Sequence, residues 1–202
     1  MSKLRTSELA KILGMNTATP IHNAEANDQA PYWETDYSAG GQRRYTGEHA
    51  LAWLLAELLR GQGLSVGMAG AAVARHSKVI ALFLNDVEAQ QPSEHLFVLD
   101  ILFCVEDSLT GGHRWESQGS YGDTQASVQG QMVVALGRAG EVVSTRNGRT
   151  QERKVAGPWV AVASIPEAYR LLCQRAREAG YVVAGRSVLK IAAEISTEQD
   201  EA

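Results

Sequence analysis

The chain is poor in aromatic residues and in long apolar runs, and each shortage excludes a class of protein. Aromatic side chains make up 6% of its 202 residues and hydrophobic residues 45%, which is typical of a globular chain that can bury a core. No apolar run approaches the roughly 20 residues of a membrane-spanning helix, so we expect no membrane partner. The amino-terminal residues also lack the apolar stretch of a signal peptide, and we predict a cytoplasmic protein.

The chain also lacks the residue groupings that hold metals or perform covalent chemistry. It contains no Walker-type phosphate loop, no His-Glu-x-x-His sequence and no pair of cysteines at zinc-binding spacing. His95 and His113 are isolated, and the apolar neighbours of Cys104 and Cys173 favour buried free thiols in a reducing compartment. We therefore predict a protein without enzymatic activity, metal or other cofactor.

Positive charge is not in excess either. The formal net charge is −4, and the first 60 residues hold six Lys and Arg against seven Asp and Glu. A nucleic-acid interface in this chain would have to depend on where individual arginines lie, because the bulk charge does not attract phosphate.

Residues 4–15 predict a short helix that ends in a glycine turn. Thr6 or Ser7 can cap this helix, and Gly14 can end it. Its apolar face repeats at helical spacing through Leu9, Ile12 and Leu13. Thr6 is also a candidate for contact with DNA, because it lies at the start of the helix.

A second helix, short and weakly apolar, is predicted to follow. It can begin at one of three capping residues, Asn16, Thr17 or Thr19. Pro20 is tolerated there because N–H groups in the first turn have no partner within the helix. If this helix forms, Asn16, Thr17, Thr19 and His22 are candidates for contact with bases or phosphates.

Residues 40–48 predict a basic β-hairpin with a glycine pair at its tip, leading into a helix. Side chains alternate along a strand, so either Arg43 or Arg44 can face phosphate while the other packs or pairs on the opposite face. Tyr45 can either donate to phosphate or fill the space between hairpin and helix. Thr46 can cap the helix, whose apolar positions are Leu51, Leu54, Leu55, Leu58 and Leu59.

A further helix is predicted over residues 64–74, with Ser65 as its cap. From there, positions at near-heptad spacing are apolar with one histidine among them: Val73, His76, Ile80, Phe83 and Val87. This spacing suits a dimerisation helix. It suits equally well a core helix packed on the chain's own carboxy-terminal part, because two heptads do not separate these possibilities.

The pattern changes after a boundary at residues 90–93, Gln-Gln-Pro-Ser. Strands are predicted at 96–105, 131–136, 141–145 and 159–163, with Asn147-Gly148 as a tight hairpin turn. An amphipathic helix is predicted at 166–180, followed by two strands or a strand and a helix at 181–183 and 188–191. The basic cluster of Arg138, Arg146, Arg149, Arg153 and Lys154 indicates an exposed hairpin or a contact with nucleic acid or an acidic partner.

Three segments within residues 4–73 resemble the DNA-binding domain of the MerR (mercury-resistance regulator) family. They are Thr6-Ser7-Glu8-Leu9-Ala10 with Gly14-Met15, Arg43-Arg44-Tyr45-Thr46, and Leu58-Leu59-Arg60-Gly61-Gln62-Gly63-Leu64-Ser65. They look like that family's first helix and turn, its arginine-rich wing, and the helix-turn that follows. The resemblance covers roughly a third of the chain. It implies a homodimeric transcription regulator that binds a pseudo-palindromic site in double-stranded DNA.

Together these features predict an α+β protein in three parts. Residues 1–74 would form a winged helix-turn-helix domain, 75–91 a linking or dimerisation helix, and 92–202 a mixed α/β domain for regulation or interaction. The predicted function is sequence-specific DNA binding by a homodimer that represses or activates transcription. A small ligand or another protein could bind the carboxy-terminal domain. The alternative is a protein-interaction adaptor that keeps the winged-helix fold without binding DNA.

Overall fold

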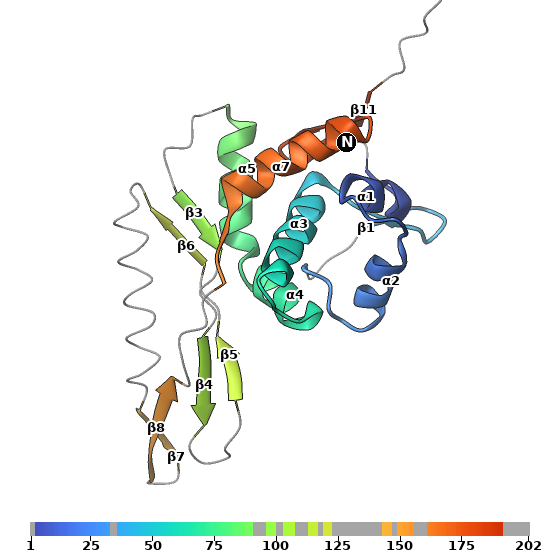
Figure 1. Ribbon diagram of the computed structural model, residues 1–202. Coiled ribbons are helices and arrows are strands. Elements are labelled where there is room, and N and C mark those ends of the chain that lie inside the picture. Colours follow the sequence, from blue (N-terminus) through green and yellow to red (C-terminus); the bar gives the residue numbers. More distant parts are fainter. Residues whose placement is uncertain are drawn as a thin grey trace, which may run out of the picture.

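The computed structural model describes residues 3–32, 36–90 and 161–191, and between residues 91 and 160 only the backbone of separate strands. Its helices are α1 (Thr6–Ile12), α2 (Thr19–Ala26), α3 (Gly47–Gly61), α4 (Val66–Arg75), α5 (Ser77–Glu88) and α7 (Ile165–Glu178) (Figure 1). The strands of the two ends are β1 (Asp36–Tyr37), β2 (Arg43–Arg44), β9 (Ala163–Ser164), β10 (Tyr181–Ala184) and β11 (Ser187–Lys190). The described part therefore combines helices with small antiparallel sheets, in agreement with the predicted α+β class.

Helix α1 forms where the sequence predicted it, with a different cap. Arg5 occupies the N-cap position, and its backbone N–H donates to Glu8 Oε2 at 2.7 Å, so neither Thr6 nor Ser7 is the cap. Gly14 follows the helix with a φ of +74°, a left-handed conformation that glycine adopts without steric cost.

Helix α2 also forms, and it exposes a polar face. It begins after Ala18 without a side-chain cap, so the predicted caps Asn16, Thr17 and Thr19 are not used. Pro20 lies in the first turn, where its missing N–H removes no helical hydrogen bond. Ile21, Ala24 and Glu25 form the buried face.

The β1–β2 hairpin leads directly into the central helix, α3. Gly41 lies in the hairpin turn with a φ of +72°. Thr46 caps α3 as predicted, since its Oγ1 accepts the His49 backbone N–H at 3.4 Å. Residues 50–56 are all buried, so α3 is covered on every side, which explains why this stretch is apolar on all faces.

Two helices, not one, carry the near-heptad positions. Helix α4 is capped by Ser65 as predicted and ends before His76, after which α5 begins. Val73, Ile80 and Phe83 are buried in the chain's own core, and His76 and Val87 are partly buried. These side chains therefore occupy the position of a core helix, one of the two arrangements their spacing allowed.

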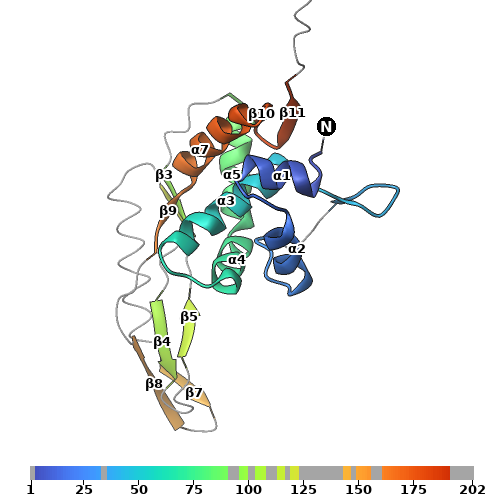
Figure 2. The ribbon, with the colours of Figure 1, turned by 45° about the vertical axis from the view of Figure 1, so that its right-hand side comes forward.

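The carboxy-terminal segment, residues 161–191, forms the predicted helix and the predicted pair of strands. Ser164 Oγ accepts the Glu167 backbone N–H at 3.4 Å and so caps α7. Strands β10 and β11 then pair antiparallel, with Tyr181 opposite Lys190. Both ribbon views show α7 lying alongside α3 and α5 (Figures 1 and 2).

This segment shares one hydrophobic core with the amino-terminal helices. Phe83 of α5 packs edge-on against Tyr169 of α7, with ring centroids 5.4 Å apart. The Gln62 side chain forms two hydrogen bonds of 2.9 Å with the backbone of Val162, one as donor and one as acceptor. Residues 161–191 therefore pack with the amino-terminal helices, although the boundary predicted near residue 92 assigned them to a separate domain.

Arg186, in the turn between β10 and β11, joins that hairpin to α3 and α5. Its guanidinium donates to Glu48 Oε2 at 3.0 Å, Glu88 Oε2 at 2.7 Å, Asn85 Oδ1 at 3.0 Å and the Ala81 carbonyl at 3.2 Å. Its carbonyl accepts the Gly47 backbone N–H at 2.9 Å. We call Arg186 and these four partners, three side chains and one backbone carbonyl, the Arg186 centre; it fixes the turn against the first residue of α3.

The strands between residues 91 and 160 form two antiparallel groups. β3 (Leu96–Leu99) lies between β6 (Gly119–Gly122) and β9, and β4 (Phe103–Asp107) pairs with both β5 (His113–Glu116) and β8 (Arg149–Val155). β7 (Val143–Arg146) pairs antiparallel with β8, and Arg146 lies opposite Arg149. The predicted turn at Asn147-Gly148 lies outside the described residues. The predicted strand at 131–136 lies outside the described residues. In the part of the chain that the structure describes, no helix is long and apolar enough to cross a membrane.

Candidate nucleic-acid interface

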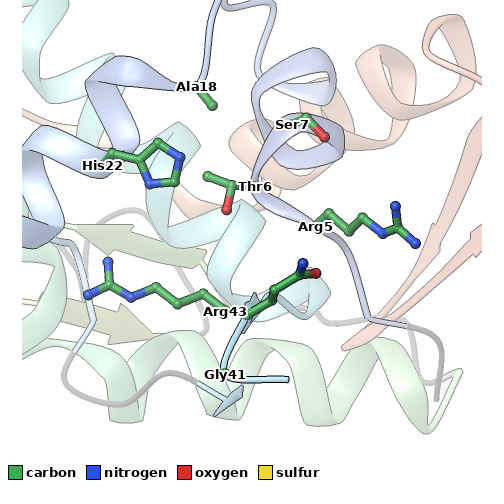
Figure 3. A pocket seen from close by; sticks show the side chains of 8 residues that line it. Arg5, Thr6, Ser7, Ala18, His22, Gly41 and Arg43 are labelled. Atoms are coloured by element: carbon green, nitrogen blue, oxygen red, sulfur yellow. The ribbon is translucent and has the colours of Figure 1, made fainter. Parts of the chain in front are cut away.

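A groove lies between the start of α1, the start of α2 and the β1–β2 hairpin. Its volume is about 540 Å³, and it is lined by Arg5, Thr6, Ser7, Ala18, His22, Gly41, Gln42 and Arg43 (Figure 3). The lining contains two arginines, one histidine and two hydroxyl groups, and it contains no carboxylate. Such a lining favours an anion, because guanidinium and hydroxyl groups donate hydrogen bonds to phosphate oxygens.

The groove brings together three of the predicted DNA contacts, namely Thr6, His22 and Arg43. Arg5 and Ser7, which flank Thr6 in the chain, also line the groove and were not among the predicted contacts. Their position next to Thr6 would have identified them, because neighbouring side chains at the amino end of a helix can reach the same ligand. In Figure 3 the Arg43 guanidinium lies on the same side of the groove as His22, and Arg5 lies on the other side.

Helix α2 adds an exposed polar face next to the groove. Thr19, His22 and Asn23 are exposed, and their spacing places them on one side of the helix. Asn16 and Thr17 are exposed in the turn that precedes it. Asn23 was not a predicted contact, although its position three or four residues from the other two would have identified it. An asparagine amide both donates and accepts, which matches the edge of adenine in the major groove.

The two hairpin arginines have different surroundings, as strand alternation predicted. Arg43 Nη1 forms an ion pair with Glu25 Oε2, and the Arg43 side chain keeps 32% of its surface exposed. Hydrogen bonds to Tyr37 and Glu25 hold the pKa of Arg43 above its usual value, against the effect of burial. Arg44 is half-buried and has no ion pair or side-chain hydrogen bond with any described residue. Among the two hairpin arginines, Arg44 is therefore the one without an ion pair to a described residue.

Glu25, on the buried face of α2, is the one buried charged side chain among the described residues, at 8% exposure. Its Oε1 accepts hydrogen bonds from the Tyr32 hydroxyl at 2.7 Å and from the Tyr45 hydroxyl at 2.8 Å. Its Oε2 accepts a hydrogen bond from Arg43 Nη1. The Tyr32 hydroxyl in turn accepts from Trp53 Nε1 at 3.2 Å. We call Glu25 with Tyr32, Arg43 and Tyr45 the Glu25 centre. It satisfies a buried carboxylate with three donors, one of which carries the opposite charge.

Tyr45 fills the space between the hairpin and α3. Its side chain is fully buried, and its hydroxyl bonds both Glu25 and, at 3.4 Å, Thr6 Oγ1. Burial, together with the hydrogen bond to the Glu25 carboxylate, raises the pKa of Tyr45 to about 12. Because this hydroxyl is hydrogen-bonded inside the protein, Tyr45 fills the space between the hairpin and the helix, as one of the two predictions had it, and does not face a phosphate.

A different motif, missed in the sequence, occurs between α3 and α4. Residues Gly63-Leu64-Ser65-Val66-Gly67 match the Gly-x-Ser-x-Gly pattern of serine hydrolases. In those enzymes the serine lies on a sharp turn from a strand to a helix. Here Ser65 follows helix α3, and its Oγ accepts the Met68 backbone N–H at 3.3 Å as the cap of α4. The geometry of this serine is that of a helix cap.

The described residues hold no cluster of three or more His, Cys, Asp or Glu side chains that could bind a metal ion. Cys173 is a free, half-buried thiol whose pKa is raised by burial. The side chain of Cys104, like those of the basic cluster from Arg138 to Lys154, lies outside the described residues.

Comparison with known proteins finds no matching family model and no matching curated protein. The similarity to the MerR family therefore depends on the three sequence segments that carry it. Any function for the groove has to be argued from its own residues.

Proposed function

We propose that the protein is a DNA-binding transcription regulator and that the groove beside α1, α2 and the β1–β2 hairpin contacts the DNA. In this proposal α1, the glycine turn and α2 are the helix-turn-helix, and the hairpin is the wing. The observation that carries it is the lining of the groove, where Arg5, His22 and Arg43 gather with two hydroxyls and no carboxylate. The two arginines place positive charge in this groove, although the net charge of the whole chain is −4.

Two kinds of contact follow from the positions of the side chains. Arg5, Arg43 and Arg44 would bind phosphates, which hold the protein on the duplex without selecting a sequence. Thr19, His22 and Asn23, exposed on α2, would read base edges in the major groove. In this proposal the arginines supply affinity and the α2 side chains supply sequence specificity, so the two properties can be tested with separate variants.

The proposal includes a homodimer on a pseudo-palindromic site. Val73, Ile80 and Phe83 are buried within the chain, so a dimer contact would lie elsewhere on its surface. In sedimentation velocity a dimer would give twice the monomer mass at micromolar concentration. A monomer on DNA and in free solution would remove this part of the proposal and leave the groove unaffected.

The test is a fluorescence-polarisation titration of labelled random-sequence duplex at 50 and 200 mM salt. We expect salt-dependent binding, and we expect Arg5→Ala and Arg44→Ala each to lower the slope of log affinity against log salt by about one. The matched control is Arg170→Ala, which removes the same charge from α7, where Arg170 is 78% exposed and pairs with Glu167. An equal loss in the control, or no binding by the wild type at low salt, would contradict the proposal.

The second candidate function is a protein-interaction adaptor that keeps this fold without DNA contact. The ion pair between Arg43 and Glu25 favours it, because that arginine already has an internal acidic partner. The absence of DNA binding at low salt, with a folded protein, would select this alternative.

A further inference from the structure

We propose that Glu25 is a positioning residue: it orients Arg43 toward the DNA backbone and holds α2 in register with the β1–β2 hairpin. This inference rests on the proposed DNA-binding function. It adds a residue that touches no DNA itself, and its sequence context gave no sign of the role.

The geometry converges on one carboxylate. Glu25 belongs to α2, and its donors Arg43 and Tyr45 belong to the hairpin and its end. The Tyr45 hydroxyl reaches Thr6 of α1, and the Tyr32 hydroxyl reaches Trp53 of α3. Helices α1 and α3 and strand β2 are therefore linked to Glu25 of α2, directly or through one tyrosine.

The chemistry of the pair explains how Glu25 would act on DNA binding. A guanidinium has five N–H donors in a rigid plane, and its contacts with Glu25 and Tyr37 use only part of them. Arg43 lines the groove and stays 32% exposed, so a phosphate that enters the groove can reach this guanidinium. A fixed guanidinium loses less conformational entropy on binding than a free one, so the anchored arginine binds phosphate more tightly.

A simple charge argument predicts the opposite result. If Glu25 only neutralised Arg43, removing its charge would strengthen DNA binding. The Glu25→Gln variant, which keeps the size of the side chain and loses the ion pair, separates the two roles. Losing the orientation of Arg43 would weaken DNA binding, whereas losing its neutralisation would strengthen it.

The experiment first selects duplexes from a random pool with the wild-type protein. An absence of enrichment or binding would count against the proposed function itself, before Glu25 is examined. With an enriched duplex, affinity and salt slope are measured for the wild type, Glu25→Gln, Arg43→Ala, the double variant and Glu88→Gln. The last is the matched control, since Glu88 also pairs with an arginine, Arg186, but lies outside the groove.

We expect Glu25→Gln to weaken binding about tenfold, the effect of losing roughly one oriented charge-assisted hydrogen bond, and to lower the salt slope by about one. Because Glu25 acts through Arg43, the double variant should bind within about threefold of Arg43→Ala. Glu88→Gln should match the wild type. A purely structural role would reduce the folded fraction and leave the salt slope of the folded protein unchanged.

Three outcomes would overturn the inference: unchanged or tighter binding by Glu25→Gln, additive losses in the double variant, or an equal loss in Glu88→Gln. If Glu25→Gln does not fold, Tyr45→Phe replaces it. This variant removes one of the three donors to Glu25 and keeps the buried ring. It should weaken binding about threefold at an equal folded fraction, and unchanged binding would overturn the inference as well.

Discussion

Two charged side chains, Glu25 and Arg186, each collect several partners, and they do so in opposite ways. Glu25 is a buried acceptor whose partners lie 7 to 20 residues away in the chain. Arg186 is a partly exposed donor whose partners lie 98 to 138 residues away. The first organises the proposed DNA-binding elements locally, and the second attaches the carboxy-terminal hairpin to them.

We expect burial, more than the number of partners, to decide how much each charged centre contributes to stability. The Glu25 carboxylate has almost no contact with water, so its partners are indispensable. The carboxylates of Glu48 and Glu88 keep about a third of their side-chain surface exposed, and water can replace Arg186. We therefore expect the two centres to respond very differently to equivalent substitutions.

The largest effect is expected when each centre loses a carboxylate. Glu25→Ala should lower the free energy of unfolding by about 3 kcal/mol, because a buried ion pair is broken and two tyrosine hydroxyls lose their acceptor. Glu88→Ala should cost less than about 1 kcal/mol. Urea unfolding followed by tryptophan fluorescence measures both. Equal losses would show that burial does not separate the two centres.

A substitution at Gly47 tests how closely the turn between β10 and β11 packs against α3. A Cβ at Gly47 would come within 2.4 Å of the Gly185 carbonyl oxygen, a backbone atom that cannot move aside alone. Gly47→Ala should therefore cost about 2 kcal/mol by forcing the turn away from α3. Gly61→Ala, in the last turn of the same helix, meets nothing within 4 Å and should cause no loss. Similar stabilities of the two variants would contradict this close approach.

Removing the Arg186 side chain should lower the stability of the fold less than displacing the turn that carries it. Arg186→Ala removes the pairs with Glu48 and Glu88, both partly screened by solvent, and should cost about 1 kcal/mol. The control Arg170→Ala, whose pair with Glu167 is largely exposed, should change stability within error. A loss of 3 kcal/mol or more in Arg186→Ala, the size of about one broken buried pair, would place it in the same class as Glu25.

The smallest effect concerns alkaline pH and involves two tyrosines, Tyr45 of the Glu25 centre and Tyr169, which contacts the turn that carries Arg186. Burial raises the pKa of Tyr45, which bonds Glu25, and that of Tyr169, which accepts the Gly185 N–H, to about 12 from 10.0. Since the folded pKa lies above the unfolded one, this stabilisation is complete below pH 10 and is lost as pH rises toward 12. Unfolding free energies at pH 9 to 12 should decline less steeply in Tyr45→Phe and in Tyr169→Phe. Parallel curves for wild type and variants would exclude these tyrosines as the cause.

The sequence alone determined the local elements. Thr46, Ser65 and Ser164 cap helices because their hydroxyls need only an N–H three residues ahead. The glycine turn after α1, the basic hairpin and the final pair of strands likewise depend on spacings of a few residues. Three of the predicted contacts, Thr6, His22 and Arg43, line one groove because α1, α2 and the hairpin pack together.

Tertiary structure alone decided which charges are buried and which distant segments meet. Glu25 is one of seven acidic residues near the amino terminus, and only packing against Tyr32 and Tyr45 distinguishes it from an exposed acid. Likewise, the near-heptad positions could serve a partner or the core, and one of them, Phe83, packs against Tyr169 of α7, which is more than 80 residues further along the chain. Apolar spacing specifies that a face will be buried. The identity of what covers it depends on long-range packing, which no local pattern encodes.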